Sequence, residues 1–285
     1  MTARYRVLPQ VKFKGFRDLE RRRVQASDAV WAILVGSKLA CQTMAEAPDQ
    51  LALLADAYPE VEHVQRMNQR LDRAAAILDR AEGDVCTMAL SFTFGLHEDF
   101  LRACLGFLVP LGLITPAAIR NANSAGLHEK VGEVTGRPVD ADALALFHLT
   151  RHIRNAHTHS AGLVRSTLVD YYASLDAPKR ALWESVTSEP FRIPIMGESA
   201  AIGSSGLVGS LAIQKRLAYD VNVALQNVVP RDRWADMAAD EYFEESSKSV
   251  KDPTALRSLR GYVRGCFDAL ALSDVELQAA IDRRK

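Results

Sequence analysis

The sequence predicts an all-α protein, and three observations indicate this. From Ser27 onward the apolar residues recur three and four positions apart, as they do on one face of a helix. Alanine, leucine, arginine and glutamate, which favour helices, are abundant. Strand signals are scarce, with one short alternating run at 191–195. We therefore expect an up-and-down helical bundle with a helical carboxy-terminal extension and one short irregular or hairpin insert.

The first expected element is a basic amino-terminal arm, residues 1–26. Between residues 4 and 23 the chain carries eight basic residues against two acidic ones. Such a segment is either a solvated arm or a contact for phosphates. In the second case Arg21, Arg22 and Arg23 are the candidate RNA contacts. Three aromatic residues of the arm are then available for stacking on bases: Tyr5, Phe13 and Phe16.

The second expected element is the helical bundle itself, residues 27–188. Its apolar spacing predicts helices at 27–46, 61–82 and 84–109, and the last is apolar on most sides, which indicates burial. Glycines and a proline make 126–139 an irregular connection before the next helix.

The remaining chain is expected to form a loop or small hairpin at 189–206 and a helical region at 207–285. An acidic run at 240–245 is a candidate cover for the basic arm. Helix starts carry residues that favour N-cap positions: Thr115, Asp140 or Asp142, Asp176, Asp252, and Ser273 with Glu276.

Composition excludes several classes of protein. The 285 residues are 48% hydrophobic and 25% charged, as in globular domains and unlike disordered chains. Thirty-five basic residues balance thirty-five acidic ones, so only a local patch could attract nucleic acid. The four cysteines form no close pair, which argues against a zinc ribbon or a redox motif. We expect no metal and no cofactor.

The sequence also predicts a cytoplasmic protein without membrane contact. Residues 1–23 mix charge with short apolar runs, unlike a secretory signal. The least charged segment, 85–119, is interrupted by Glu98, Asp99 and Arg102, whereas a membrane span needs about twenty uninterrupted apolar residues.

The segment 143–162 stands apart because it holds four of the seven histidines together with arginine and asparagine. On a helix, five polar side chains share one face that lacks a carboxylate: His148, Arg151, His152, Asn155 and His159. Arginine binds phosphate oxygens, and imidazole transfers protons near neutral pH. An RNA strand supplies its own nucleophile, the 2′-hydroxyl, so this face suits metal-independent phosphodiester chemistry.

Arg154, Asn155 and His159 form an R-N-x-x-x-H sequence that resembles the arginine-to-histidine motif of the HEPN superfamily. The resemblance implies a helical bundle over about residues 27–175 that forms homodimers, with the motifs of two protomers lining one cleft. Many members are metal-independent endoribonucleases of toxin–antitoxin, abortive-infection and other prokaryotic defence systems. The resemblance therefore implies RNA as substrate and an antitoxin or regulator as partner. By position, Arg154 contacts the scissile phosphate, Asn155 is the adjacent polar residue, and His159 is the acid or base.

Two parts of this assignment have alternatives. A second frame, Arg151 to His157 with His152 between them, satisfies the same spacing. Family members often carry an acidic residue on a preceding helix that points at the motif, and Glu98 or Asp99 could take that place. Otherwise these two carboxylates are the exposed edge of a buried helix.

Two other functions compete with the nuclease. The first is a non-catalytic HEPN-type dimerisation or interaction module, which the neutral charge favours and the basic arm opposes. The second, less favoured, is a hydrolase with a histidine-bound metal, because His148 and His152 lie four residues apart. An obvious third ligand is missing from the sequence pattern, since neither His97-Glu98 nor His128-Glu129 extends to HExxH.

Overall fold

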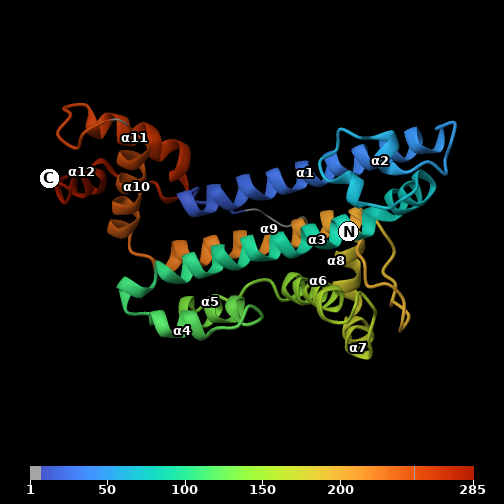
Figure 1. The fold of residues 1–285 in the computed structure, drawn as a ribbon. Coiled ribbons are helices and arrows are strands. Elements are labelled where there is room, and N and C mark those ends of the chain that lie inside the picture. Colours follow the sequence, from blue (N-terminus) through green and yellow to red (C-terminus); the bar gives the residue numbers. More distant parts are fainter. Residues whose placement is uncertain (1–7, 247) are drawn as a thin grey trace. The chain divides into compact units, whose positions relative to one another are not determined.

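The computed structural model describes residues 8–246 and 248–285, and the expected all-α class is confirmed (Figure 1). Within these ranges the chain forms twelve α-helices, three short 3₁₀ helices and no strand. No helix of the described ranges has the length and apolar composition needed to cross a membrane. The α-helices are α1 Lys14–Ala45, α2 Leu54–Ala57, α3 Leu71–Gly106, α4 Pro116–Asn121, α5 Leu127–Thr135, α6 Ala141–His159, α7 Ser166–Ser174, α8 Ala177–Thr187, α9 Ser204–Val228, α10 Arg231–Glu245, α11 Ala255–Cys266 and α12 Asp274–Asp282.

Several helices begin at the predicted N-caps. The Thr115 hydroxyl accepts a hydrogen bond from the Ala118 amide, at 3.2 Å. Asp140 accepts one from the Ala143 amide, at 2.9 Å, and so starts α6. Asp176 caps α8, and Ser273 with Glu276 forms a complete capping box at α12. Each cap satisfies an amide that the first turn leaves without an intrahelical partner.

Two local predictions about helices were wrong. The helices expected at 61–82 and 84–109 are largely one, α3, which continues through Gly83. The connection expected at 126–139 contains α5, because Leu127 and Val131 are fully buried there. Burial of these apolar side chains outweighs the cost of a glycine within the helix.

The insert expected at 189–206 is irregular up to the start of α9 and forms no hairpin. Its extended part pairs with the turn after α6 instead of folding back on itself. The Val164 amide donates to the Glu198 carbonyl at 2.9 Å, and the Gly197 amide donates to the Val164 carbonyl at 3.0 Å. The only strand-like pairing in this part of the described chain is the bridge between Leu163 and Ser199.

The described chain divides into two compact units that interleave along the sequence. Unit 1 contains the residues up to Arg22, Gly95–His148 and Ala212–Lys285. Unit 2 contains Arg23–Phe94 and Leu149–Leu211. This differs from the consecutive boundaries expected after residues 26, 188 and 206. Four helices, α1, α3, α6 and α9, contribute residues to both units, and apolar periodicity along a continuous helix carries no sign of such a division.

The basic arm is folded rather than free from residue 13 onward. Helix α1 begins at Lys14, and Phe13 and Phe16 are buried in the core of unit 1. The expectation that these two rings are available to stack on bases was therefore wrong. Residues 1–7, which include Arg4, Tyr5 and Arg6, lie outside the described residues.

The core of unit 1 joins the start of the chain to its carboxy-terminal helices. The Phe13 ring lies 5.3 Å from Phe107, 6.0 Å from Trp234 and 6.3 Å from Phe100, measured between ring centroids. Trp234 in turn contacts Phe267 at 6.4 Å. These rings bring α1, α3, α10 and the end of α11 into one apolar cluster.

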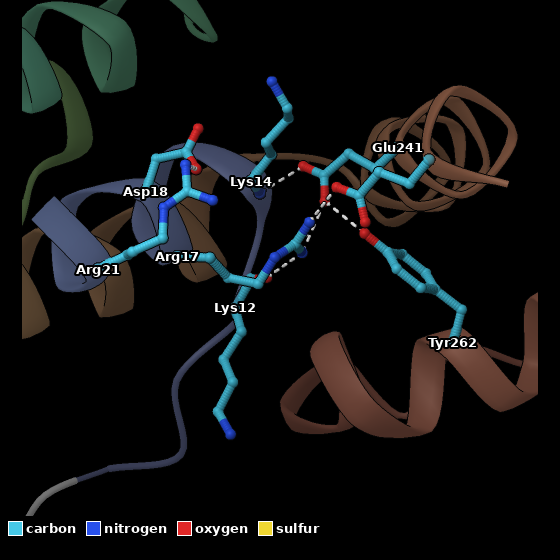
Figure 2. A network of polar contacts seen from close by, with 8 residues as sticks. Lys12, Lys14, Arg17, Asp18, Arg21, Glu241 and Tyr262 are labelled. Atoms are coloured by element: carbon cyan, nitrogen blue, oxygen red, sulfur yellow. Dashed lines mark hydrogen bonds and ion pairs between the residues drawn. The ribbon is translucent and has the colours of Figure 1, made fainter.

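Beside this cluster, a buried carboxylate on α10 holds the start of α1 (Figure 2). Glu241 accepts hydrogen bonds from the Lys14 amide at 2.6 Å, from the Arg17 guanidinium at 3.0 Å and from the Tyr262 hydroxyl at 3.0 Å. Burial and the charge of Glu241 raise the pKa of the Tyr262 hydroxyl, so it stays a donor at neutral pH. Arg17 also pairs with Glu245, so the acidic run covers the basic arm at this residue, as expected.

Unit 1 also encloses a pair of histidines from α3 and α5. The Nε2 atoms of His97 and His128 lie 2.9 Å apart, and both side chains are fully buried. The Phe147 ring covers His128 edge-on at 4.8 Å between centroids. Burial holds the pKa of His128 well below its ordinary value, and the neighbouring His97 and His148 lower it further. His128 is therefore held neutral, and one of the two Nε2 atoms donates a hydrogen bond to the other.

Acidification is expected to destabilise the protein through His128. The unfolded chain, in which the histidine pKa is about 6.5, binds this proton more tightly than the folded chain. The free energy of unfolding should therefore fall as the pH drops below 6.5, by about 1.4 kcal/mol per pH unit for this group, until the folded-state pKa is reached. Urea titrations between pH 7.5 and 5.5 measure this slope. His128→Gln keeps a polar side chain of similar size and should have a shallower slope, and an unchanged slope would contradict the assignment.

Candidate functional site

The polar segment lies on α6, which stays a regular helix through His159. Its expected core stripe is buried, namely Leu146, Leu149, Ile153 and Ala156. The helix ends in a tight turn in which Ala161 and Gly162 have φ values of 53° and 74°. The Ala200 amide donates to the Gly162 carbonyl at 2.7 Å, so the irregular segment before α9 pins this turn.

The arginine of the motif packs on an aromatic ring and forms no ion pair within the described part of the chain. The Arg154 guanidinium lies over the Phe94 ring, 5.7 Å from its centroid. Its Nε is buried without a hydrogen-bond partner among the described residues, and so is the Nε of Arg151. No carboxylate of the described ranges lies within ion-pair distance of either side chain, whereas Arg102 pairs with Glu98.

A partly buried guanidinium without a carboxylate is unusual, because buried polar groups are nearly always paired. Arg151 and Arg154 lie three residues apart on one helix, so their side chains are neighbours. Their donors are suited to the oxygens of a phosphate, which accepts several hydrogen bonds and neutralises both charges. The arrangement can therefore bind an anion.

The regular helix fixes how the motif residues are distributed around α6. Positions five residues apart differ by about 140°, so Arg154 and His159 do not share a face of one helix. Arg151 and His157 differ by about 120°. Arg154 and His157 differ by only about 60°, and Arg151 and Asn155 by about 40°. His159 is exposed at the end of the helix. One chain thus groups Arg154 with His157 rather than with His159.

The other two histidines of the expected polar face have partners within their own units. The His152 ring packs on Tyr171 of α7, with centroids 4.5 Å apart. His148 Nε2 lies 3.4 Å from Glu129 Oε1. Among the described residues, no group of three histidine, cysteine, aspartate or glutamate side chains is placed to hold a metal ion.

The candidate supporting acids lie on the part of α3 that belongs to unit 1. The Glu98 carboxylate accepts hydrogen bonds from Arg102 at 2.8 Å and from the Ser124 hydroxyl at 2.5 Å. Arg102 also donates to the Ile119 and Ala122 carbonyls, so Glu98 braces the end of α4. Asp99 is exposed. A role for either acid at the motif stays a prediction.

The three arginines expected to contact RNA differ in their surroundings. Arg21 pairs with Asp18 at 2.7 Å on the surface of α1. Arg22 is exposed. Arg23 is partly buried and donates to the Leu211 carbonyl at 3.1 Å. Arg21 and Arg22 are thus both open to solvent, and RNA contact by any of the three arginines stays a prediction.

Two aromatic residues near the motif were not foreseen: Phe94, under Arg154, and Tyr171, against His152. Both come from other helices, and no local pattern in the sequence pairs them with α6.

Comparisons of the chain with family models, with curated proteins and with solved structures found no match. The HEPN assignment therefore stays a prediction that rests on the motif residues alone.

Proposed function

We propose that the end of α6 binds the sugar–phosphate backbone of RNA and cleaves it without a metal ion. The observation that supports this most directly is the pair of guanidinium groups of Arg151 and Arg154, whose buried Nε atoms have no hydrogen-bond partner among the described residues. A phosphate would supply the missing negative charge. In this proposal Arg154 binds the scissile phosphate, Asn155 orients it, and His159 transfers a proton.

The chemistry needs only groups that the RNA and this helix supply. The 2′-oxygen attacks the adjacent phosphorus, the bond from phosphorus to the 5′-oxygen breaks, and a 2′,3′-cyclic phosphate forms. One imidazole removes the proton of the 2′-hydroxyl, and a second donates a proton to the leaving 5′-oxygen. Arginine stabilises the charge that develops on the phosphoryl oxygens.

The positions of Arg154 and His159 around α6 favour a site built from two chains. Because these side chains lie about 140° apart on one helix, a composite site across a homodimer could combine Arg154 of one protomer with His159 of the other. His157, on the same side as Arg154, belongs to the second frame with Arg151 and His152. We propose a prokaryotic defence or toxin–antitoxin role, in which an antitoxin or regulator controls the nuclease.

Incubation of the purified full-length protein with total RNA in EDTA tests this function. We expect cleavage products with cyclic phosphate ends, and Arg154→Ala and His159→Ala should each lower the rate at least roughly tenfold. Arg165→Ala is the matched control, because Arg165 is an exposed arginine just beyond the turn after α6, and it should cleave normally. Loss of activity in His157→Ala but not in His159→Ala would favour the second frame. Full activity in both Arg154→Ala and His159→Ala would contradict the residue assignment.

A non-catalytic interaction module is the second candidate, and the packing of His152 on Tyr171 favours it. In such a module the polar segment would be structural, and the folded protein would leave RNA intact with and without divalent metal. Cleavage that appears only when EDTA is omitted would instead favour a hydrolase with a histidine-bound metal.

A further inference from the structure

The middle of α1 is apolar on all sides, and most of it is exposed although Val30 is buried. Residues 29–36 read AVWAILVG, without a polar side chain. A helix segment that is apolar all round is normally covered all round. Here Trp31, Ile33 and Val35 are 45%, 51% and 58% exposed. Within unit 2 this segment therefore presents apolar surface of the kind that marks an interaction site.

One side of α1 has the spacing of a helix-pairing seam. Six exposed residues of unit 2 follow one another at intervals of four, three, four, three and four, and we name them the α1 face: Val24, Asp28, Trp31, Val35, Lys38 and Gln42. Alternating steps of three and four keep these positions on one side of the helix, and three of the six residues are apolar: Val24, Trp31 and Val35. The face is about 27 Å long, since a helix rises about 1.5 Å per residue.

The charges of the α1 face are complementary to those of a second copy of the same helix. Consider a second copy of the same helix that runs antiparallel and is centred on the level of residue 33. Trp31 then opposes Val35 of the other copy, and Asp28 opposes Lys38. Because the helix pair is symmetric, each of these two contacts occurs twice, and each aspartate faces a lysine. A parallel pairing would instead place Asp28 against Asp28 and Lys38 against Lys38, which costs energy.

We propose that two copies of this chain associate through the α1 face in an antiparallel helix pair. The chain carries equal numbers of basic and acidic residues, so two copies approach without net repulsion. The Lys38 Nζ atom also lies 3.0 Å from Asp79 Oδ1 of its own chain. This ion pair is exposed, and the Lys38 ammonium can bind Asp79 and the Asp28 carboxylate of the second copy together. The inference depends on α1 alone and is independent of the proposed function.

Sedimentation equilibrium of the full-length protein tests the inference, with circular dichroism to confirm that each variant is folded. The wild-type protein should be a dimer. Trp31→Lys should raise the dissociation constant by roughly thirtyfold or more, because an aromatic residue at the centre of an interface contributes strongly. Ile33→Lys is the matched control, since Ile33 is equally exposed but lies on the other side of α1, and it should dimerise normally.

Charge exchange tests the antiparallel register. Asp28→Lys alone and Lys38→Asp alone should each weaken the dimer, by about tenfold, because like charges then face each other. The double variant should restore it, and a mixture of the two single variants should form heterodimers. Asp79→Asn removes the intrachain partner of Lys38 without touching the face and should have no effect. A monomeric wild-type protein, a defect in Ile33→Lys equal to that of Trp31→Lys, or a double variant no better than the single ones would overturn the inference.

Discussion

Replacement of Glu241 by alanine is expected to lower the free energy of unfolding by about 3 kcal/mol. The Glu241 side chain is only 8% exposed and accepts hydrogen bonds from the Lys14 amide, Arg17 and Tyr262. Its removal takes this acceptor away from the Lys14 amide and the Tyr262 hydroxyl in a largely buried site. This loss of stability should be near the low end of the range for variants that remove one partner of a buried ion pair, because Arg17 keeps a second carboxylate partner in Glu245.

Glu245→Ala is the matched control for this experiment. Glu245 binds the same guanidinium, but its side chain is 42% exposed, and exposed ion pairs contribute about 1 kcal/mol or less. Urea titrations followed by circular dichroism and tryptophan fluorescence would measure both variants. If Glu241→Ala were no less stable than Glu245→Ala, the network would not hold α1 to α10.

Replacement of Phe13 by alanine is expected to cost about 3–5 kcal/mol of stability. The ring is fully buried and contacts Phe100, Phe107 and Trp234. Its removal loses buried apolar surface and leaves a cavity where three elements meet, and these neighbours cannot collapse completely into the space. Because Trp234 borders the cavity, its fluorescence should report the loosened packing.

Phe92→Ala controls for the residue type. Phe92 is an exposed phenylalanine on α3, and its removal should change the free energy of unfolding by about 0.5 kcal/mol or less. The same thermal and urea unfolding measurements apply to both variants. A Phe13→Ala protein with wild-type stability but weaker RNA binding would restore the view that Phe13 belongs to a free basic arm.

The candidate site was only partly accessible from sequence. The composition of residues 143–162 indicated α6 as the candidate site, because a polar helix face of imidazoles, arginine and asparagine without a carboxylate is unusual. The spacing of Arg154 and His159 says nothing about the Phe94 ring under the guanidinium or about the Arg154 Nε, which has no hydrogen-bond partner among the described residues. Those features depend on side chains from other helices, which no local pattern specifies.

The sequence by itself determined the all-α class, the buried stripe of α6 and the caps at Thr115, Asp176 and Ser273, because helix formation depends on neighbours within about four positions. Only the tertiary structure decided that α1 starts at Lys14, that residues 127–135 are helical and that Phe13 is a core residue. Periodicity tells which side of a helix is buried, but the partner that buries it can lie hundreds of residues away. The contact of Phe13 with Trp234 and the bond from Arg17 to Glu241 are interactions of this long-range kind.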